Sequence, residues 1–327
     1  MLYPLKFTPI LKERIWGGDY LYKKFGKGTD SDINIGESWE VSAVKDNVSV
    51  VSEGILAGND LFELIEVYMG DLVGDKVYEK FGVEFPVLVK FLVAKSDVSI
   101  QVHPNEEYAN EKFGEHGKAE MWYIFDAEKD AKIIAGFDRN TSREEVEQAI
   151  NNDTITQLLR IDDAQKGDVF DIPVGRVHAI CKDNVIVEIQ QTSDLTFRIY
   201  DYDRVDDNGN KRDLHVQQSL DVLDFNAKEN YKIPYNKEIN EPTNLIKNEH
   251  FTTNLLSFDK KLGRDYYLLD SYVVLVCTEG EFDIEYKEGG SVNVKVGESV
   301  LLPACIQEYY FNPKTEKATF IETYLEL

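Results

Sequence analysis

The stretch Ser99-Ile100-Gln101-Val102-His103-Pro104 sets the expectation for the fold. In an extended strand, residues two positions apart point to the same face, so Gln101 and His103 share one face. Pro104 ends the apolar run, which places His103 at a strand end, where a side chain can face a cavity. A lone histidine in an apolar strand is more often packed in a core. The choice between a metal ligand and a core residue therefore depends on the rest of the chain.

The composition is that of a globular protein. The 327 residues are 43% hydrophobic and 12% aromatic, which is enough for a large buried core. The chain contains neither a long apolar run nor an N-terminal secretory signal. The three cysteines, Cys181, Cys277 and Cys305, are widely spaced, so neither a disulfide framework nor a thiolate metal site is expected. A reducing cytoplasm is the expected location.

The formal net charge is −24, which argues against nucleic acid and acidic membranes as partners. A small anionic substrate remains compatible with this charge if the chain builds a local basic pocket. Cationic residues inside apolar or acidic stretches are therefore informative. The alternative is that the excess negative charge has no role in binding and only keeps the protein in solution.

The chain is expected to be mainly β with a small helical part. Short extended segments bounded by Gly, Pro and Asp recur from the N-terminus to the C-terminus. Helices are predicted near residues 60–80, 105–117 and 141–160. In the last of these, Ser142 and Glu145 are spaced as a capping box, and the apolar face is interrupted near 151–153. A turn is expected at 206–210. Residues 234–248 read as a polar connection, so we predict a catalytic domain over 1–240 and a C-terminal β domain over 241–327.

A weak internal repeat links the two predicted domains. Residues 167–174 and 297–304 both read as a turn, a strand and a proline. The fifth residue after the first proline is His178, whereas Glu308 occupies this position in the second copy. If two copies of one β-barrel are present, the chemistry belongs to the N-terminal copy and the second copy is structural.

Further segments supply candidate metal ligands. Glu120 begins an apolar strand, and a tight turn delivers His178 onto another. Together with Gln101 and His103 they offer two imidazoles, a carboxylate and an amide oxygen. Such a set suits zinc, although manganese, iron or cobalt could also bind, because ligand type alone does not settle the metal.

Three cations accompany these candidates. In an extended strand, Lys118 and Glu120 would point to the same face, and so would Asp194 and Arg198. An arginine beside a carboxylate is usually a salt bridge, which is the alternative interpretation of Asp194 and Arg198. Lys90 lies in the apolar run 86–94, so its ammonium either reaches the surface or faces a polar cavity. A positive pocket in an acidic protein would suit an anionic substrate.

The sequence resembles the type I mannose-6-phosphate isomerases, which are zinc-dependent enzymes of the cupin superfamily. The resemblance spans residues 14 to 204 and rests on several segments: 16–18, 36–40, 99–104, 120–123, 173–180 and 188–198. It implies two cupin-type β-barrels of the jelly-roll class, the N-terminal one metal-binding and the C-terminal one degenerate. The chain lacks most of the separate helical domain of longer members and so resembles a short bacterial form.

The resemblance also implies site roles. Gln101, His103, Glu120 and His178 match the family's zinc ligands, with one zinc ion per chain. Arg198 and Lys118 match catalytic positions, whereas Lys90 and Asp194 match substrate-binding positions. The expected reaction interconverts mannose 6-phosphate and fructose 6-phosphate by proton transfer through a cis-enediol.

Several alternatives stay open at this point. The proton could be moved by Lys118 or by a water molecule activated by the metal. The chain could instead be a non-catalytic sugar-binding cupin with a structural metal, or another cupin enzyme such as an iron-dependent oxygenase or a phosphoglucose isomerase. The expected partner is a small phosphosugar, with no nucleic acid and no membrane. The sequence does not predict the oligomeric state.

Overall fold

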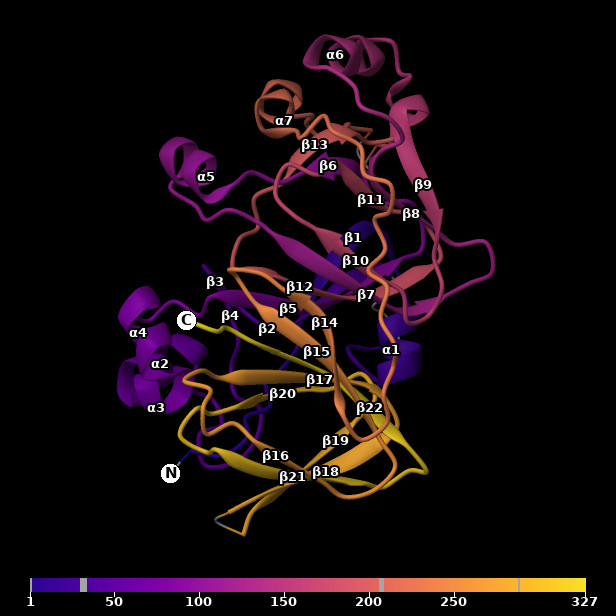
Figure 1. Cartoon of the computed structure of the whole chain (residues 1–327). Coiled ribbons are helices and arrows are strands. Elements are labelled where there is room, and N and C mark those ends of the chain that lie inside the picture. Colours follow the sequence, from indigo (N-terminus) through magenta and orange to yellow (C-terminus); the bar gives the residue numbers. More distant parts are fainter. Residues whose placement is uncertain (1, 30–33, 206–208, 288) are drawn as a thin grey trace.

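The computed structural model describes residues 2–29, 34–205, 209–287 and 289–327 (Figure 1). The chain is mainly β, and most of its strands belong to four antiparallel sheets stacked one above the next (Figure 1). Part of the turn expected at 206–210 lies outside the described residues. In the parts that are described, no helix is long and apolar enough to cross a membrane.

The first two sheets form the N-terminal sandwich. A six-stranded sheet has the order β1 (Ile10–Gly18), β2 (Ile35–Val41), β5 (Val87–Ala94), β12 (Asn184–Gln191), β7 (Glu120–Ala127), β10 (Val169–Ile172). It faces a five-stranded sheet with the order β13 (Phe197–Tyr200), β6 (Ile100–Val102), β11 (His178–Ile180), β8 (Lys132–Phe137), β9 (Leu159–Asp163). Apolar side chains of both sheets, such as Trp122, Ile133 and Ile180, pack between them.

The other two sheets form the C-terminal sandwich. Its five-stranded sheet has the order β14 (Pro242–Lys247), β15 (Thr252–Phe258), β22 (Ala318–Tyr324), β17 (Val273–Glu279), β20 (Ser299–Leu302). Its four-stranded sheet has the order β16 (Leu262–Asp265), β21 (Glu308–Pro313), β18 (Glu281–Tyr286), β19 (Ser291–Lys295). A two-stranded ribbon, β3 (Ala43–Val44) with β4 (Asn47–Val48), lies apart from these sheets.

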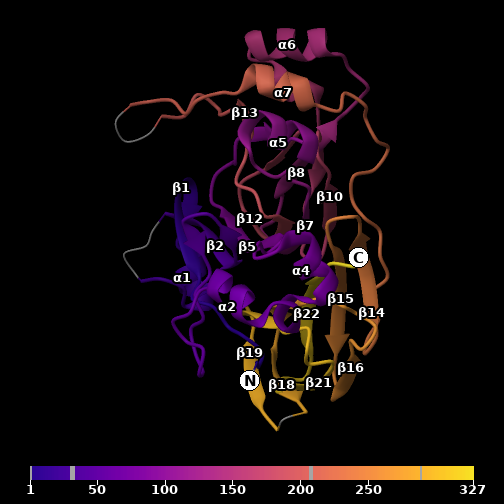
Figure 2. The same cartoon turned by 90° about the vertical axis from the view of Figure 1, so that its left-hand side faces the viewer.

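The helices are short and lie around the sheets. They are α1 (Tyr20–Phe25), α2 (Leu61–Tyr68), α3 (Gly70–Val73), α4 (Asp75–Phe81), α5 (Glu106–Phe113), α6 (Arg143–Asn151) and α7 (Val216–Val222). Figure 2 shows α6 and α7 side by side at one end of the molecule, and α2 and α4 beside the junction of the two sandwiches. Asp60 begins α2 with a complete capping box, in which its carboxylate and that of Glu63 each accept a backbone N–H.

The helix expected over 141–160 stops at the interruption predicted near 151–153, and the residues beyond it do not resume an α-helix. It ends at Asn151, and Asp153 follows with a φ of 56°, a left-handed conformation that an α-helix cannot contain. A short 3₁₀ turn, Ile155–Leu158, leads directly into β9. Ser142 caps α6 by accepting from the N–H of Glu145, but the Glu145 carboxylate accepts from Thr141 instead of completing the box.

The polar connection expected over 234–248 contains a strand. Its last residues form β14, which pairs with β15 at the edge of a sheet. Alternate side chains of this strand, Thr243 and Leu245, are buried, whereas Asn244 is exposed. An edge strand needs only one apolar face. The polar residues on the other face of β14 made this segment look like a connection in the sequence.

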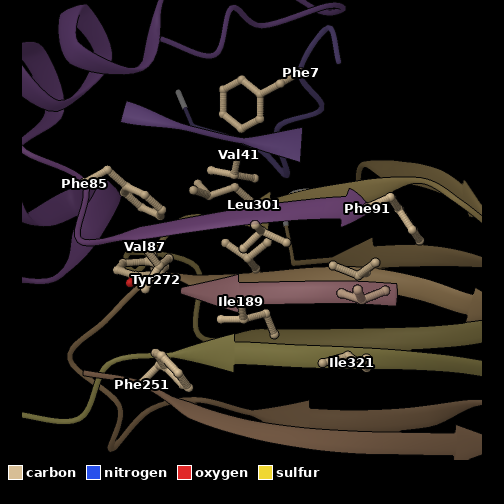
Figure 3. Close-up of a cluster of buried hydrophobic side chains, with 14 of the residues drawn as sticks. Phe7, Val41, Phe85, Val87, Phe91, Ile189, Phe251, Tyr272, Leu301 and Ile321 are labelled. Carbon is tan, nitrogen blue, oxygen red and sulfur yellow. The ribbon is translucent and has the colours of Figure 1, made fainter. Parts of the chain in front are cut away.

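A single core joins the two sandwiches. The outer face of the six-stranded sheet packs on the C-terminal five-stranded sheet, and Figure 3 shows side chains from both sheets gathered in this core, among them Val41, Val87, Leu301 and Ile321. Helices α2 to α4 add apolar side chains to the same cluster. Strands β5 and β12 are therefore covered on both faces, which explains their nearly continuous apolar sequences.

We expect the two sandwiches to unfold together, since neither covers this core alone. Leu301→Ala should lower the free energy of unfolding by about 2–5 kcal/mol, because Leu301 is fully buried in the shared cluster. Denaturant unfolding followed by circular dichroism and by tryptophan fluorescence should give coincident transitions for wild type and variant. Leu268→Ala, at a side chain that is 95% exposed, is the matched control. Two separated transitions would contradict a shared core.

Candidate metal centre

Three strands bring the candidate ligands together inside the N-terminal sandwich. Gln101 on β6 is paired with His178 at the start of β11, and His103 follows the end of β6. Glu120 begins β7 on the facing six-stranded sheet. The centre thus forms where strand ends of two facing sheets meet.

The three ionisable ligands converge closely. His103 Nε2 is 3.4 Å from Glu120 Oε2, and His178 Nε2 is 3.4 Å from Glu120 Oε1. The potential ligand atoms all lie within 4.8 Å of one another, and the three residues are at most 1% exposed. This is the arrangement of a preformed cation site.

Both imidazole rings are oriented by backbone carbonyls. His103 Nδ1 lies 3.0 Å from the carbonyl oxygen of Leu195, and His178 Nδ1 lies 2.8 Å from that of Arg176. A carbonyl only accepts hydrogen bonds, so each Nδ1 carries the proton and each Nε2 presents its lone pair toward Glu120.

The converging atoms have little else to bind. His103 Nε2 and both carboxylate oxygens of Glu120 are buried without a hydrogen-bond partner among the described residues. Buried polar atoms of this kind are costly unless something satisfies them. The residues present therefore fit a divalent cation, which would take all three atoms as ligands.

Gln101 lies beside this group. Its Nε2 is placed 3.3 Å from His178 Nε2, and rotation of the amide by a half turn would put Oε1 in that place. The side chain can thus offer an oxygen donor next to the imidazole.

Burial controls the protonation of the three ionisable residues when no metal is bound. It lowers the pKa of His178 to about 3 and that of His103 well below its usual range, so both rings are neutral near pH 7. Burial, with the nearby Glu188 carboxylate, raises the pKa of Glu120 to about 8. The histidines are ready to bind a metal, whereas Glu120 must first lose a proton.

The affinity of the metal-free protein for a divalent cation should therefore rise with pH. Below the pKa of Glu120 the cation displaces a proton, so the affinity should increase by up to about tenfold per pH unit and level off above about pH 8. Competition with a chromophoric chelator between about pH 6 and pH 9 would measure this. An affinity that is flat over the whole range would contradict the protonated state of Glu120.

Lys118 is buried at the same centre. Its side chain is 5% exposed and its Nζ lies 3.8 Å from Glu120 Oε2. The expected parity of Lys118 and Glu120 is confirmed by this proximity.

Lys90 is also buried, and it faces a polar interior rather than the surface. Its Nζ lies 2.8 Å from Glu188 Oε1 and 3.9 Å from Glu37 Oε2. Burial opposes the charge of Lys90, but the two carboxylates outweigh it and raise its pKa. Despite burial of its own carboxyl group, Glu37 has its pKa lowered to about 2 by Lys90 and Arg14. Lys90 is therefore held as a charged group.

Arg198 lies on β13, directly across from Gln101 on β6. Its guanidinium donates to Ser99 Oγ at 3.3 Å and to the carbonyl of Asp213 at 2.8 Å. Asp194 is exposed and lines a cleft of about 1010 Å³ that also passes Leu195, whose carbonyl orients His103. No ion pair between Asp194 and Arg198 occurs in the described part of the chain, so the ordinary salt-bridge reading of this pair is wrong.

Sequence reasoning missed two sets of charged residues. Glu188 accepts from Trp122 Nε1 at 2.8 Å and pairs with Lys90 across the β12–β5 ladder. It is an acidic residue inside an apolar strand, the same signal that singled out Lys90. The second set is Arg204 and Arg212, which both bind the Asp201 carboxylate near Arg198. The guanidinium groups of Arg198, Arg204 and Arg212 outnumber the Asp201 carboxylate, so this region carries excess positive charge.

The chain is similar in sequence to known phosphomannose isomerases. A family model described as phosphomannose isomerase type I, catalytic domain, matches residues 4–141. Mannose-6-phosphate isomerase ManA of Bacillus subtilis is 44% identical over 225 residues, covering 68% of each chain. Mannose-6-phosphate isomerase of Streptococcus mutans serotype c is 35% identical over 317 residues, covering 97% of each chain.

The similarity extends to a solved structure. The crystal structure of the mannose 6-phosphate isomerase from Bacillus subtilis superposes with a TM-score of 0.88 at 31% identity, covering 98% of this chain and 99% of that one. Similarity in sequence to the Streptococcus mutans protein and in fold to the Bacillus subtilis structure thus extends along nearly the whole length of this chain. The chain belongs to the type I phosphomannose isomerase family.

Proposed function

We propose that the chain interconverts D-mannose 6-phosphate and D-fructose 6-phosphate by moving a proton between C2 and C1 through a cis-enediol. The observation that carries the proposal is the buried group of His103, Glu120 and His178, whose potential ligand atoms converge beside the Lys118 side chain. The named activity of the relatives in Bacillus subtilis and Streptococcus mutans supports the same reaction.

The centre would hold one zinc ion per chain through Gln101, His103, Glu120 and His178. Two imidazole nitrogens with oxygen donors and no thiolate favour zinc over softer ions. A bound divalent ion supplies Lewis-acid stabilisation of the negative charge that develops on the sugar oxygens, which is worth several kcal/mol.

Lys118 is proposed as the residue that carries the proton. Its side chain is buried at the centre, with Nζ 3.8 Å from Glu120 Oε2, and is shielded from bulk water. As the neutral amine it would take the proton from one carbon and, as the ammonium so formed, return it to the other. A group that exchanges a proton between adjacent carbons must remain within reach of both, and a fixed, desolvated side chain meets this requirement.

The cations around the centre suit an anionic sugar. Arg198 is proposed to bind the sugar oxygens and the enediolate, with Lys90 adding positive charge and Asp194 binding hydroxyl groups at the cleft. Lys90 is held in place by Glu188 and Glu37. It would therefore attract the anionic substrate through its fixed positive charge rather than by moving into contact with it. The positive region at Arg204 and Arg212 supports recognition of a phosphate in a protein of net charge −24.

The finer architecture is part of the proposal. We assign both sandwiches to the cupin class of double-sheet jelly rolls, with a catalytic domain over 1–240 and a degenerate C-terminal domain over 241–327. The repeat supports this, because β10 and β20 are both edge strands that follow a glycine with positive φ, Gly167 and Gly297. A cytoplasmic location is proposed because the three cysteines are odd in number and widely spaced in the sequence.

The proposal is tested by a coupled assay for fructose 6-phosphate formation. The zinc-loaded protein should turn over mannose 6-phosphate and leave glucose 6-phosphate essentially unconverted. Conversion of glucose 6-phosphate at a similar rate would favour a phosphoglucose isomerase. Metal-dependent stability without any turnover would favour a binding cupin, and activity that required redox-active iron and dioxygen would favour an oxygenase.

Arg198→Ala should lower kcat/KM for mannose 6-phosphate by about 100-fold to 1000-fold, because a donor to the developing negative charge is lost. Arg198→Lys should recover only part of this, since an ammonium cannot reproduce the two-pronged geometry of a guanidinium. Steady-state kinetics would measure both variants. Arg139→Ala, at an arginine that pairs with Glu145 at the surface, is the matched control. A wild-type rate in Arg198→Ala would remove Arg198 from the site.

A further inference from the structure

The segment that carries Lys118 is fastened at three consecutive backbone amides. The N–H of Gly117 donates to Glu106 Oε2 at 2.9 Å, and the N–H of Lys118 donates to the carbonyl of Pro104 at 3.1 Å. The N–H of Ala119 donates to Gln191 Oε1 at 2.9 Å. Side chains therefore hold the residues immediately before and after Lys118.

The two fastening side chains are joined to each other. Gln191 Nε2 donates to Glu106 Oε2 at 3.2 Å, and the Gln191 N–H donates to the carbonyl of Ala119 at 3.1 Å. Glu106 is the first residue of α5 and Gln191 is the last of β12. His116 adds a bridge, with Nδ1 2.7 Å from Glu106 Oε1 and Nε2 3.0 Å from Glu84 Oε2.

The segment approaches α5 so closely that only glycine fits at position 117. A Cβ on Gly117 would lie 2.6 Å from the backbone nitrogen of Glu106 and 2.8 Å from the carbonyl carbon of Asn105. Both contacts involve backbone atoms, which cannot move aside as a flexible side chain would. The position of the segment is thus built into the fold.

Lys118 needs such support. A lysine side chain favours water, and a buried one usually relies on a close partner. The nearest carboxylate oxygen paired with Lys118 is 3.8 Å from Nζ, which is longer than a hydrogen bond. The charge of Glu120 alone therefore does not fix the ammonium at its place beside the centre.

We propose that Glu106 and Gln191 are positioning residues that hold the backbone of Lys118 and thereby keep its ammonium inside the site. We call the two side chains the Lys118 clamp. The expected effect on turnover rests on the proposed proton-carrying role of Lys118. The expected effect on the position of the Lys118 side chain does not depend on that role. Among the described residues, no hydrogen bond or ion pair joins Glu106 or Gln191 to a candidate metal ligand, but Gln191 also holds Ala119, which directly precedes Glu120. The tests must therefore separate an effect through Lys118 from an effect on the bound metal.

The kinetic test compares Glu106→Ala, Gln191→Ala and Glu106→Gln in the zinc-loaded protein. Misplacing a catalytic group by a fraction of an ångström to an ångström should lower kcat by about 10-fold to 100-fold, with KM and bound zinc nearly unchanged. Glu106→Gln keeps an acceptor for the Gly117 N–H and should recover most of kcat. Glu107→Ala, at the exposed neighbour on α5, is the control and should behave as wild type. A kcat in both alanine variants equal to wild type would overturn the proposal.

A double variant separates positioning from general damage. If Glu106 acts through Lys118, Glu106→Ala should cause no further loss of the residual activity in a Lys118→Met background. A loss as large as in the wild-type background would overturn the proposal, because the effect would then reach the site by another route.

Amine labelling tests the clamp independently of activity. Lys118 in the metal-free wild type and in Glu107→Ala should resist reductive methylation, and the rate should rise about tenfold or more in Glu106→Ala and Gln191→Ala while both remain folded by circular dichroism. An unchanged rate in both clamp variants would overturn the clamp. If Lys118→Met itself kept full turnover, the proposed role of Lys118 would fail, and the labelling rates would still decide the clamp.

Discussion

His103→Ala should abolish tight zinc binding and lower kcat/KM for mannose 6-phosphate by about a thousandfold. His103 Nε2 is one of the converging atoms that lack a hydrogen-bond partner among the described residues, so its removal takes away a ligand without breaking another bond at that atom. Loss of the cation removes Lewis-acid stabilisation, and a loss of about 4 kcal/mol corresponds to three orders of magnitude in rate. Zinc content by atomic emission and steady-state kinetics would measure the two effects together.

The control for this variant is His250→Ala. His250 lies outside the centre, and its ring pairs with the exposed Glu249. That variant should keep its zinc and lose little activity. A His103→Ala protein that retained one tightly bound zinc ion per chain and wild-type turnover would refute the assignment of the centre.

Lys90→Met should lower the free energy of unfolding by about 3–5 kcal/mol, because it leaves the buried Glu188 carboxylate without its cation, whereas Glu37 keeps Arg14. Glu188 and Glu37 both lie within 3.9 Å of the Lys90 Nζ, and the side chains are at most 8% exposed. Glu188 would keep only the Trp122 N–H as a strong partner. Urea unfolding at neutral pH would give the change in stability.

Two comparisons sharpen this result. Lys95→Met, at an exposed lysine just past the end of β5, should change stability by less than about 0.5 kcal/mol. The double variant Lys90→Met/Glu188→Gln should recover part of the loss, since the unpaired charge is removed as well. A Lys90→Met protein as stable as wild type would mean that the buried carboxylates take up protons at little cost.

Strand parity predicted much of the site because it is a local property. Alternation along an extended chain was enough to group Gln101 with His103 and Lys118 with Glu120. It could not say which strands are neighbours. The pairing of β6 with β11, which brings His178 to Gln101, depends on contacts between segments far apart in the sequence. The partners of Lys90 were missed for the same reason.

The errors in secondary structure have local physical causes. Helices α1 and α7 have six and seven residues, which is too short for a helical apolar period to stand out. The strand β14 was missed because an edge strand exposes polar side chains on one face. The α-helix expected over 141–160 ends at Asn151, at the polar interruption near 151–153, where Asp153 has a φ of 56°. The shared core left its mark in the nearly continuous apolar sequences of β5 and β12, but these do not say which segments cover the outer face of the sheet.

The most direct test of the central proposal is a zinc titration of chelated protein, with fructose 6-phosphate formation from mannose 6-phosphate as the readout. Turnover should be absent at the start, rise in proportion to added zinc, and reach a plateau at one equivalent per chain. Full turnover in the metal-free protein would contradict the proposal, as would a folded protein with one bound zinc ion that never turns over.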